Sequence, residues 1–284
     1  MKPQASGNNQ ADKGGDRAWR ILVPCAIGVE RALGNELRHL GLAILDSGPG
    51  RFEVGANERE ILLALRCLRS AERLLVVLGE FKAFSFEDLF QGCLGIDWAA
   101  WLPRETRVHI DKVRLHESTL NSFASVQSVA QKAIYRRMGD QYHLERLPET
   151  GDEHLVRIYV ERNQARICLD LSGEALHRRG WRTKAGEAPL KESIAAAMII
   201  LSGWRRNFPF HDAFCGSGTL AAEALSFAYD LPPNLRRSFG FSRMKNYPAE
   251  TDRQLQEELA ARVNPDYEVL IRASDQDPRM AELS

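Results

Sequence analysis

The chain has 284 residues, of which 44% are hydrophobic and 27% are charged, so its composition is that of an ordinary folded protein of about two domains. Lysine plus arginine and aspartate plus glutamate number 38 each, so any nucleic-acid binding must come from local basic patches and not from a global field. No apolar run reaches the roughly 18 residues that span a bilayer, and five cysteines without C-x-x-C spacing argue against a disulfide framework or zinc knuckle and favour a reducing cytoplasm.

The first 80 residues divide into a polar tail and a small mixed domain. Residues 1–17 lack the apolar core of a signal peptide and are expected to form a disordered tail. Asn57 with Glu60 three residues later resembles a capping box at a helix start. The order strand, helix, strand, strand, helix, strand predicts a ferredoxin-like domain over residues 18–80. The periodicity of apolar residues places strands at 21–23, 42–45, 51–54 and 74–78, and helices at 29–40 and 61–68.

A second mixed domain is expected over residues 81–171, followed by a polar linker over residues 172–190. Pro189 is placed where the next helix would begin. Within the domain, the apolar patterns predict a helix from Ser85, a strand at 108–113, a helix over 126–138 closed by Gly139, and strands at 155–160 and 165–171 around a turn at 162–164.

The stretch that carries chemistry runs from Phe210 to Leu220. It reads as a strand, a glycine loop and a helix start, which together open a Rossmann-like nucleotide site. Glycines let a ligand approach the backbone closely, and the Asp212 carboxylate could hold an amino group. A second apolar run, 267–273, precedes Asp275, which could grip a ribose diol or could be an exposed or capping acid. Asp277 is the better candidate to cap the helix that starts at Pro278.

Two common nucleotide ligands do not fit this loop. A phosphate-binding P-loop needs lysine after its last glycine, and Gly218 is followed by Thr219. The dinucleotide fingerprint needs a third glycine, where the chain has Glu223-Ala224. An uncharged loop with an aspartate at the end of each strand suits an adenosine that carries an amino acid. The sequence therefore predicts S-adenosylmethionine as the cofactor.

The loop sequence Asp-Ala-Phe-Cys-Gly-Ser-Gly-Thr at 212–219 resembles the D-P-F-C-G-S-G-T motif of class I methyltransferases that modify amines. Residues 169–182 and 188–197 are similar to the RlmL-like, THUMP-domain RNA methyltransferases, which make N2-methylguanine in 23S ribosomal RNA. The resemblance implies a ferredoxin-like domain, a THUMP RNA-binding domain over 81–171, and the start of a Rossmann-like methyltransferase domain over 191–284. It also implies 23S ribosomal RNA as partner and S-adenosylmethionine contacts by Asp212, Phe214, Gly216, Ser217, Gly218, Thr219 and Asp275.

The Asn-Pro-Pro-Tyr motif, with which this family holds the target amine, does not occur in the chain. No catalytic residue is therefore assigned, and only two of about seven strands of the catalytic domain are expected. These features predict a C-terminally truncated enzyme that, by itself, binds S-adenosylmethionine weakly and transfers no methyl group. An RNA-binding module with an inactive methyltransferase stub and a DNA amino-methyltransferase are the alternatives.

A basic cluster around an aromatic residue is the candidate RNA contact. The cluster consists of Arg178, Arg179, Trp181, Arg182 and Lys184. Its charges would suit phosphate and its indole could stack on a base, although the same residues could form a solvated linker. The seven histidines show no ligand spacing, so no metal is expected.

Overall fold

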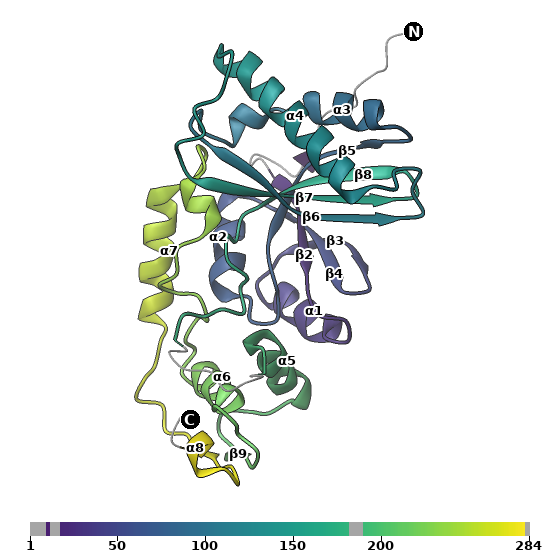
Figure 1. Cartoon of the computed structure of the whole chain (residues 1–284). Coiled ribbons are helices and arrows are strands. Elements are labelled where there is room, and N and C mark those ends of the chain that lie inside the picture. Colours follow the sequence, from purple (N-terminus) through teal and green to yellow (C-terminus); the bar gives the residue numbers. More distant parts are fainter. Residues whose placement is uncertain (1–9, 12–17, 182–189, 282–284) are drawn as a thin grey trace. The chain divides into compact units, whose positions relative to one another are not determined.

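The computed structural model describes residues 10–11, 18–181 and 190–281 (Figure 1). It divides into two compact units, each assembled from segments that are distant in sequence. The segments of the first unit are 1–21, 75–173 and 239–247, and those of the second unit are 22–74, 174–238 and 248–284. The predicted α/β fold is confirmed, since strands and helices alternate along the chain.

The predicted order of the ferredoxin-like elements is confirmed. Its α2 helix begins with the expected capping box, in which Asn57 Oδ1 accepts a hydrogen bond from the Glu60 amide and the Glu60 carboxylate accepts one from the Asn57 amide. β3 and β4 form an antiparallel hairpin that closes between Gly48 and Arg51. The elements are β2 (Ala18–Pro24), α1 (Glu30–His39), β3 (Ala43–Gly48), β4 (Arg51–Ala56), α2 (Glu58–Cys67) and β5 (Leu75–Lys82).

The expectation that residues 1–17 form a disordered tail is wrong at two residues. β1 (Gln10–Ala11) pairs antiparallel with Ala18 and Trp19 at the start of β2. Strand pairing uses backbone groups, which every residue except proline offers in full, so a polar segment can join a sheet edge without an apolar pattern.

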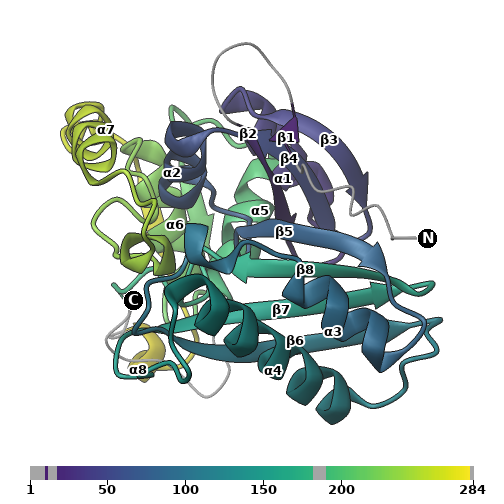
Figure 2. The same cartoon turned by 90° about the horizontal axis from the view of Figure 1, so that it is seen from above.

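The first unit contains four neighbouring strands of the eight-stranded sheet, in the order β5-β8-β7-β6, antiparallel except for the parallel pair β7 and β6. Figure 2 shows α3 and α4 together on one face of these strands. Among the described helices, none is long and apolar enough to cross a membrane. The remaining elements of this sheet and its cover are α3 (Phe86–Leu94), η1 (Trp98–Ala100), β6 (Arg107–His116), α4 (Phe123–Tyr142), β7 (Glu153–Glu161) and β8 (Gln164–Asp170).

The prediction that Gly139 closes α4 is wrong, because the helix continues to Tyr142 and ends at His143, whose φ is 56°. The chain then folds back over the last turn, and the Leu144 amide donates to the Gly139 carbonyl at 2.9 Å. A Cβ on Gly139 would lie 2.8 Å from the Leu144 carbonyl oxygen. The glycine is therefore required by this close approach and not by the helix end.

A short segment, 239–247, returns from the expected methyltransferase domain to the first unit. It holds the 3-10 turn η2 (Gly240–Arg243), and the Phe241 amide donates to the Leu171 carbonyl at 2.9 Å. Gly173 has φ +75°, and a Cβ there would lie 3.0 Å from the Gly240 nitrogen. Two glycines thus let the segment lie directly against the chain that follows β8.

The second unit continues with the elements that carry the glycine loop. Pro189 lies outside the described residues, and the helix expected to begin there begins at Glu192, with Lys191 at its N-cap. The second strand of the expected nucleotide site is shorter than the apolar run at 267–273. The elements are α5 (Glu192–Ser202), β9 (Phe210–Asp212), α6 (Thr219–Ala228), α7 (Ala249–Ala261), β10 (Ile271–Ala273) and α8 (Pro278–Ala281).

Candidate cofactor site

The glycine loop lies at the carboxyl end of two parallel strands. β9 pairs with β10, with Asp212 opposite Ala273. The Ser274 amide donates to the Asp212 carbonyl at 2.8 Å, and the Cys215 amide donates to the Ser274 carbonyl at 2.9 Å. Both strands therefore deliver their C-terminal side chains to the same edge, which is where open α/β sheets bind nucleotides.

Two glycines of the loop adopt a left-handed backbone, with φ of 51° at Gly216 and 74° at Gly218. Gly218 is the N-cap of α6, so the free amides of the first helical turn follow directly after it. Apart from Gly216 and its two chain neighbours, no heavy atom of the described residues lies within 4 Å of the position that a Cβ would take there. The loop thus leaves open space where a ligand could approach the backbone.

Asp275 fastens the loop to the end of β10. Its two carboxylate oxygens accept from the Gly216 amide and the Asp277 amide, each at 2.9 Å. The Asp277 amide and then the Gly216 amide stabilise the charged carboxylate and lower the pKa of Asp275 below its usual value of 3.8. Asp277 accepts from the Arg279 amide at 3.0 Å, as expected of a residue that caps α8.

The other residues expected at this site surround the same loop. Asp212 Oδ1 accepts from the Phe214 amide at 3.2 Å, and the Phe214 side chain is 90% exposed. Thr219 is buried at the start of α6, and Ser217 is partly exposed. The structure therefore brings Asp212, the loop and Asp275 together. In the ranges that the structure describes, no group of three or more His, Cys, Asp or Glu side chains could hold a metal ion.

The structure separates the described residues of the basic cluster around Trp181 into buried and exposed ones. Arg179 is buried and its Nε lies 3.2 Å from Glu223 Oε1 on α6. Its guanidinium also donates to the carbonyls of Leu176 and Arg69. An RNA contact by Arg179 is therefore corrected to a structural role, because its donors are used inside the protein. Arg178 is exposed and pairs with Glu174 at 3.2 Å.

Trp181 is 43% exposed, and Arg182 and Lys184 lie outside the described residues. The structure thus leaves Arg178 and Trp181 at the surface among the described members of the cluster.

The partner of Arg179 was not predicted from the sequence. Glu223 lies on the buried face of α6, and it also lies 3.6 Å from Arg69 Nη1. A lone glutamate within the apolar pattern of a helix was the signal that could have indicated a buried ion pair, since such a charge needs a partner. A second buried pair joins α2 to α7, where Arg66 and Asp252 make two hydrogen bonds of 2.7 and 2.6 Å.

A parallel strand pair with a glycine loop after one strand and an acid after the other defines the nucleotide site of a Rossmann-like class I methyltransferase domain. Residues 179–284 match the family described as "RMKL-like, methyltransferase domain", and residues 20–75 match "RlmL ferredoxin-like domain". The Bacillus subtilis protein named "Putative RNA methyltransferase YpsC" is 33% identical over 94% of this chain and 70% of its own length. The chain therefore belongs to the family of RlmK/L-like methyltransferases.

Two further relatives support this placement. The "Ribosomal RNA large subunit methyltransferase K/L" of Magnetococcus marinus is 32% identical over 94% of this chain and 38% of its own length. A solved structure described as "SMU.472, a putative methyltransferase complexed with SAH" has 34% identity and a TM-score of 0.88, over 94% of this chain and 70% of that one. SAH is what S-adenosylmethionine becomes when it gives up its methyl group, so the predicted cofactor agrees with that ligand.

Proposed function

We propose that this chain binds S-adenosylmethionine and 23S ribosomal RNA for methylation of a guanine at N2. The observation that carries the proposal is the hydrogen bond from the Gly216 amide to the Asp275 carboxylate. It connects the glycine loop after β9 to the acid after β10, at the edge of the parallel strands. The relatives named as RNA and ribosomal RNA methyltransferases support the substrate class.

The residues of the loop fit the parts of this cofactor. Asp275 is ionised at neutral pH and retains lone pairs for the ribose hydroxyls, because each oxygen accepts one protein amide. Asp212 would hold the amino group, the open backbone at Gly216 would lie along the ligand, and the exposed ring of Phe214 would cover it. The bound cofactor supplies an already activated methyl group, so these residues have to bind and orient it, not activate it.

Substitution of Asp275 tests the cofactor site. We expect Asp275→Ala to weaken S-adenosylmethionine binding by at least about tenfold, because it removes two charge-assisted acceptors and releases the Gly216 amide. Isothermal titration calorimetry measures the affinity. Asp277→Ala is the matched control, since it removes a neighbouring carboxylate that does not touch the loop. Equal affinity of the Asp275 variant and the unaltered chain would count against the site.

RNA recognition is proposed for the THUMP-like region 81–171, together with Arg178, Trp181, Arg182 and Lys184. Incubation of the chain with labelled S-adenosylmethionine and either 23S RNA fragments or DNA, followed by nucleoside mass spectrometry, tests the product. N2-methylguanosine in RNA alone is the expected product of the family activity.

A second candidate is an RNA-binding module that transfers no methyl group, a role in which the surface residues Arg178 and Trp181 would contact the RNA. RNA binding without transfer in the same assay would support this module. Methylated DNA would overturn both candidates.

A further inference from the structure

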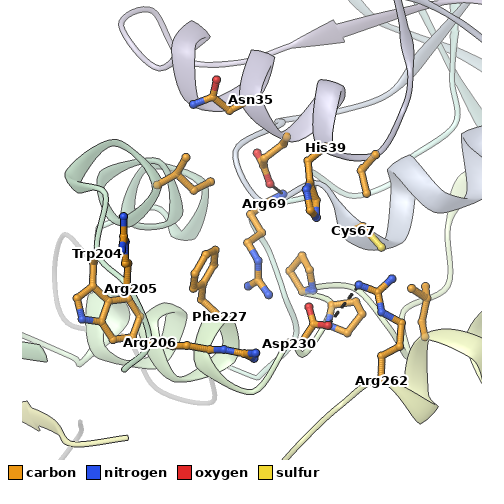
Figure 3. A pocket seen from close by; sticks show the side chains of 16 residues that line it. Asn35, His39, Cys67, Arg69, Trp204, Arg205, Arg206, Phe227, Asp230 and Arg262 are labelled. Carbon is orange, nitrogen blue, oxygen red and sulfur yellow. Dashed lines mark hydrogen bonds and ion pairs between the residues drawn. The ribbon is translucent and has the colours of Figure 1, made fainter. Parts of the chain in front are cut away.

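A cavity of about 670 Å³ lies within the second unit, at the other end of α6 from the glycine loop. Figure 3 shows its walls, which come from α1, the end of α2, the segment after α5, the end of α6 and α7. Phe227 lines it, and this residue is eight positions after Thr219, the first residue of α6. A helix rises 1.5 Å per residue, so the cavity lies roughly 12 Å along α6 from the cofactor loop. It is therefore a different site.

The charged groups that line the cavity are mainly cationic. They are the arginines Arg69, Arg205, Arg206 and Arg262, against the acids Glu36 and Asp230. Both acids already have partners, because Glu36 accepts from the Arg69 amide at 2.7 Å and the Ser70 amide at 3.0 Å, and Asp230 lies 3.3 Å from Arg262. The cavity thus keeps a surplus of positive charge for a ligand.

Arg205 and part of the Arg206 guanidinium remain available for a ligand. Arg69 is committed to the protein, since it donates to the Leu231 carbonyl at 2.6 Å and lies beside Glu223. Arg205 is exposed, and within the described part of the chain no hydrogen bond or ion pair holds its guanidinium. Arg206 is also exposed; its Nη1 donates to the Ala228 carbonyl at 3.3 Å and its guanidinium lies 4.5 Å from the centre of the Tyr267 ring, so it is partly held and keeps its remaining donors for a ligand.

Aromatic and aliphatic side chains form the rest of the wall. The Trp204 and Phe227 rings lie 6.2 Å apart, and Trp204 Nε1 donates to the Phe208 carbonyl at 3.1 Å, which fixes the indole. Leu40, Ile200 and Leu259 add apolar surface. A flat aromatic ligand group suits such a wall, and an anionic group suits Arg205 and the remaining donors of Arg206. Single-stranded nucleic acids are bound by this combination of stacking surface and cationic groove.

We propose that this cavity binds one unstacked nucleotide of an RNA strand, with its base against Trp204 and Phe227 and its phosphate beside Arg205 and Arg206. The inference rests on the proposed function, since it takes RNA as the substrate. It adds a second RNA contact, distinct from the region 81–171, on the unit that also holds the cofactor loop. Its size falls within the range of roughly 300–1,000 Å³ that is usual for ligand pockets.

Charge reversal at the mouth of the cavity is the first test. We expect Arg205→Glu to weaken binding of a single-stranded RNA oligonucleotide at least tenfold, and to lower the slope of log affinity against log salt by about one. Fluorescence anisotropy of the full chain at several salt concentrations measures both. Arg31→Glu is the matched control, because Arg31 is an exposed arginine of α1 that does not line the cavity. An equal loss in the two variants would overturn the inference.

A variant without a change of charge tests whether RNA binding depends on the shape of the cavity. Asn35 is an exposed residue of α1 that lines the cavity, so Asn35→Trp should narrow it and weaken RNA binding without changing the salt slope. Guanosine monophosphate serves as the competing free nucleotide, and binding as tight as that of the oligonucleotide would overturn the assignment to an RNA strand.

Calorimetry with S-adenosylmethionine distinguishes the two proposals. If the unaltered chain binds cofactor and RNA but both cavity variants bind RNA normally, the cavity is not an RNA site and the proposed function stands. If the unaltered chain binds no RNA, both proposals fail.

Discussion

At the residue scale, single carboxylates hold the cofactor loop and the helix that follows it, because Asp275 accepts from the Gly216 amide and Glu223 lies beside the Arg179 guanidinium. Asp275 was expected to bind a ribose, and in the structure its carboxylate also accepts a hydrogen bond from the Gly216 amide. Arg179 belonged to a run of basic residues that looks solvated, yet its guanidinium is buried beside Glu223. The partner lies 44 positions away, so no local pattern could distinguish a surface arginine from a buried one.

The pH behaviour of Asp275 follows from its two amide donors. They favour the carboxylate, so the pKa of Asp275 lies below 3.8 in the folded chain. The two hydrogen bonds to the Asp275 carboxylate therefore contribute fully above the usual aspartate pKa, and their contribution is lost only as pH falls through the lowered pKa. We expect the carboxyl carbon of Asp275, followed by NMR, to titrate below pH 3.8. A midpoint at or above 3.8 in the unaltered chain would contradict these hydrogen bonds to the Asp275 carboxylate.

At the element scale, amphipathic helices and alternating strands were predicted where one face is buried. α1 and α2 bury leucines and an isoleucine at helical spacing, which is why their positions could be inferred. α7 was not predicted, because its sequence is mostly polar and it buries only Asp252, Leu255 and Leu259. Its position depends on the buried Arg66–Asp252 pair, which is a tertiary contact that hydrophobic periodicity does not report.

The helix that begins at the cofactor loop is fixed at its middle by Glu223. The carboxylate lies between Arg179 and Arg69, and its side chain is 2% exposed. Glu223→Gln leaves two buried guanidinium groups without their countercharge, so we expect a loss of about 3–5 kcal/mol in the free energy of unfolding. Urea denaturation measures it. Glu250→Gln is the control, because Glu250 pairs with Arg253 at the surface and should change stability by less than about 1 kcal/mol. A small effect at Glu223 would show that α6 is held by packing alone.

At the scale of the whole molecule, the sequence predicted domains that follow one another along the chain. The matched family models cover residues 20–75 and 179–284. The compact units are interleaved instead, and residues 22–74 and 174–238 share one unit. Linear patterns cannot reveal this, because the buried contacts of Arg66 and Arg69 with residues after 220 are set by tertiary packing.

The interleaving makes the first unit depend on a segment far from the rest of its sequence. Phe241 is fully buried there, and its ring lies 6.5 Å from Trp101 and 5.6 Å from Tyr247. Phe241→Ala would leave a cavity in the core, so we expect the unfolding free energy to fall by about 3–5 kcal/mol. The control is Phe123→Ala, since Phe123 is 58% exposed at the start of α4 and should cost no more than about 0.5 kcal/mol.

Thermal and urea unfolding compare the stability of the two variants, and hydrogen exchange shows where in the chain stability is lost. Faster exchange should be confined to β8 and its neighbours in the first unit, because the Phe241 amide is bound to Leu171 directly after that strand. Equal stability of the two variants would mean that the segment 239–247 contributes nothing to the unit in which it lies.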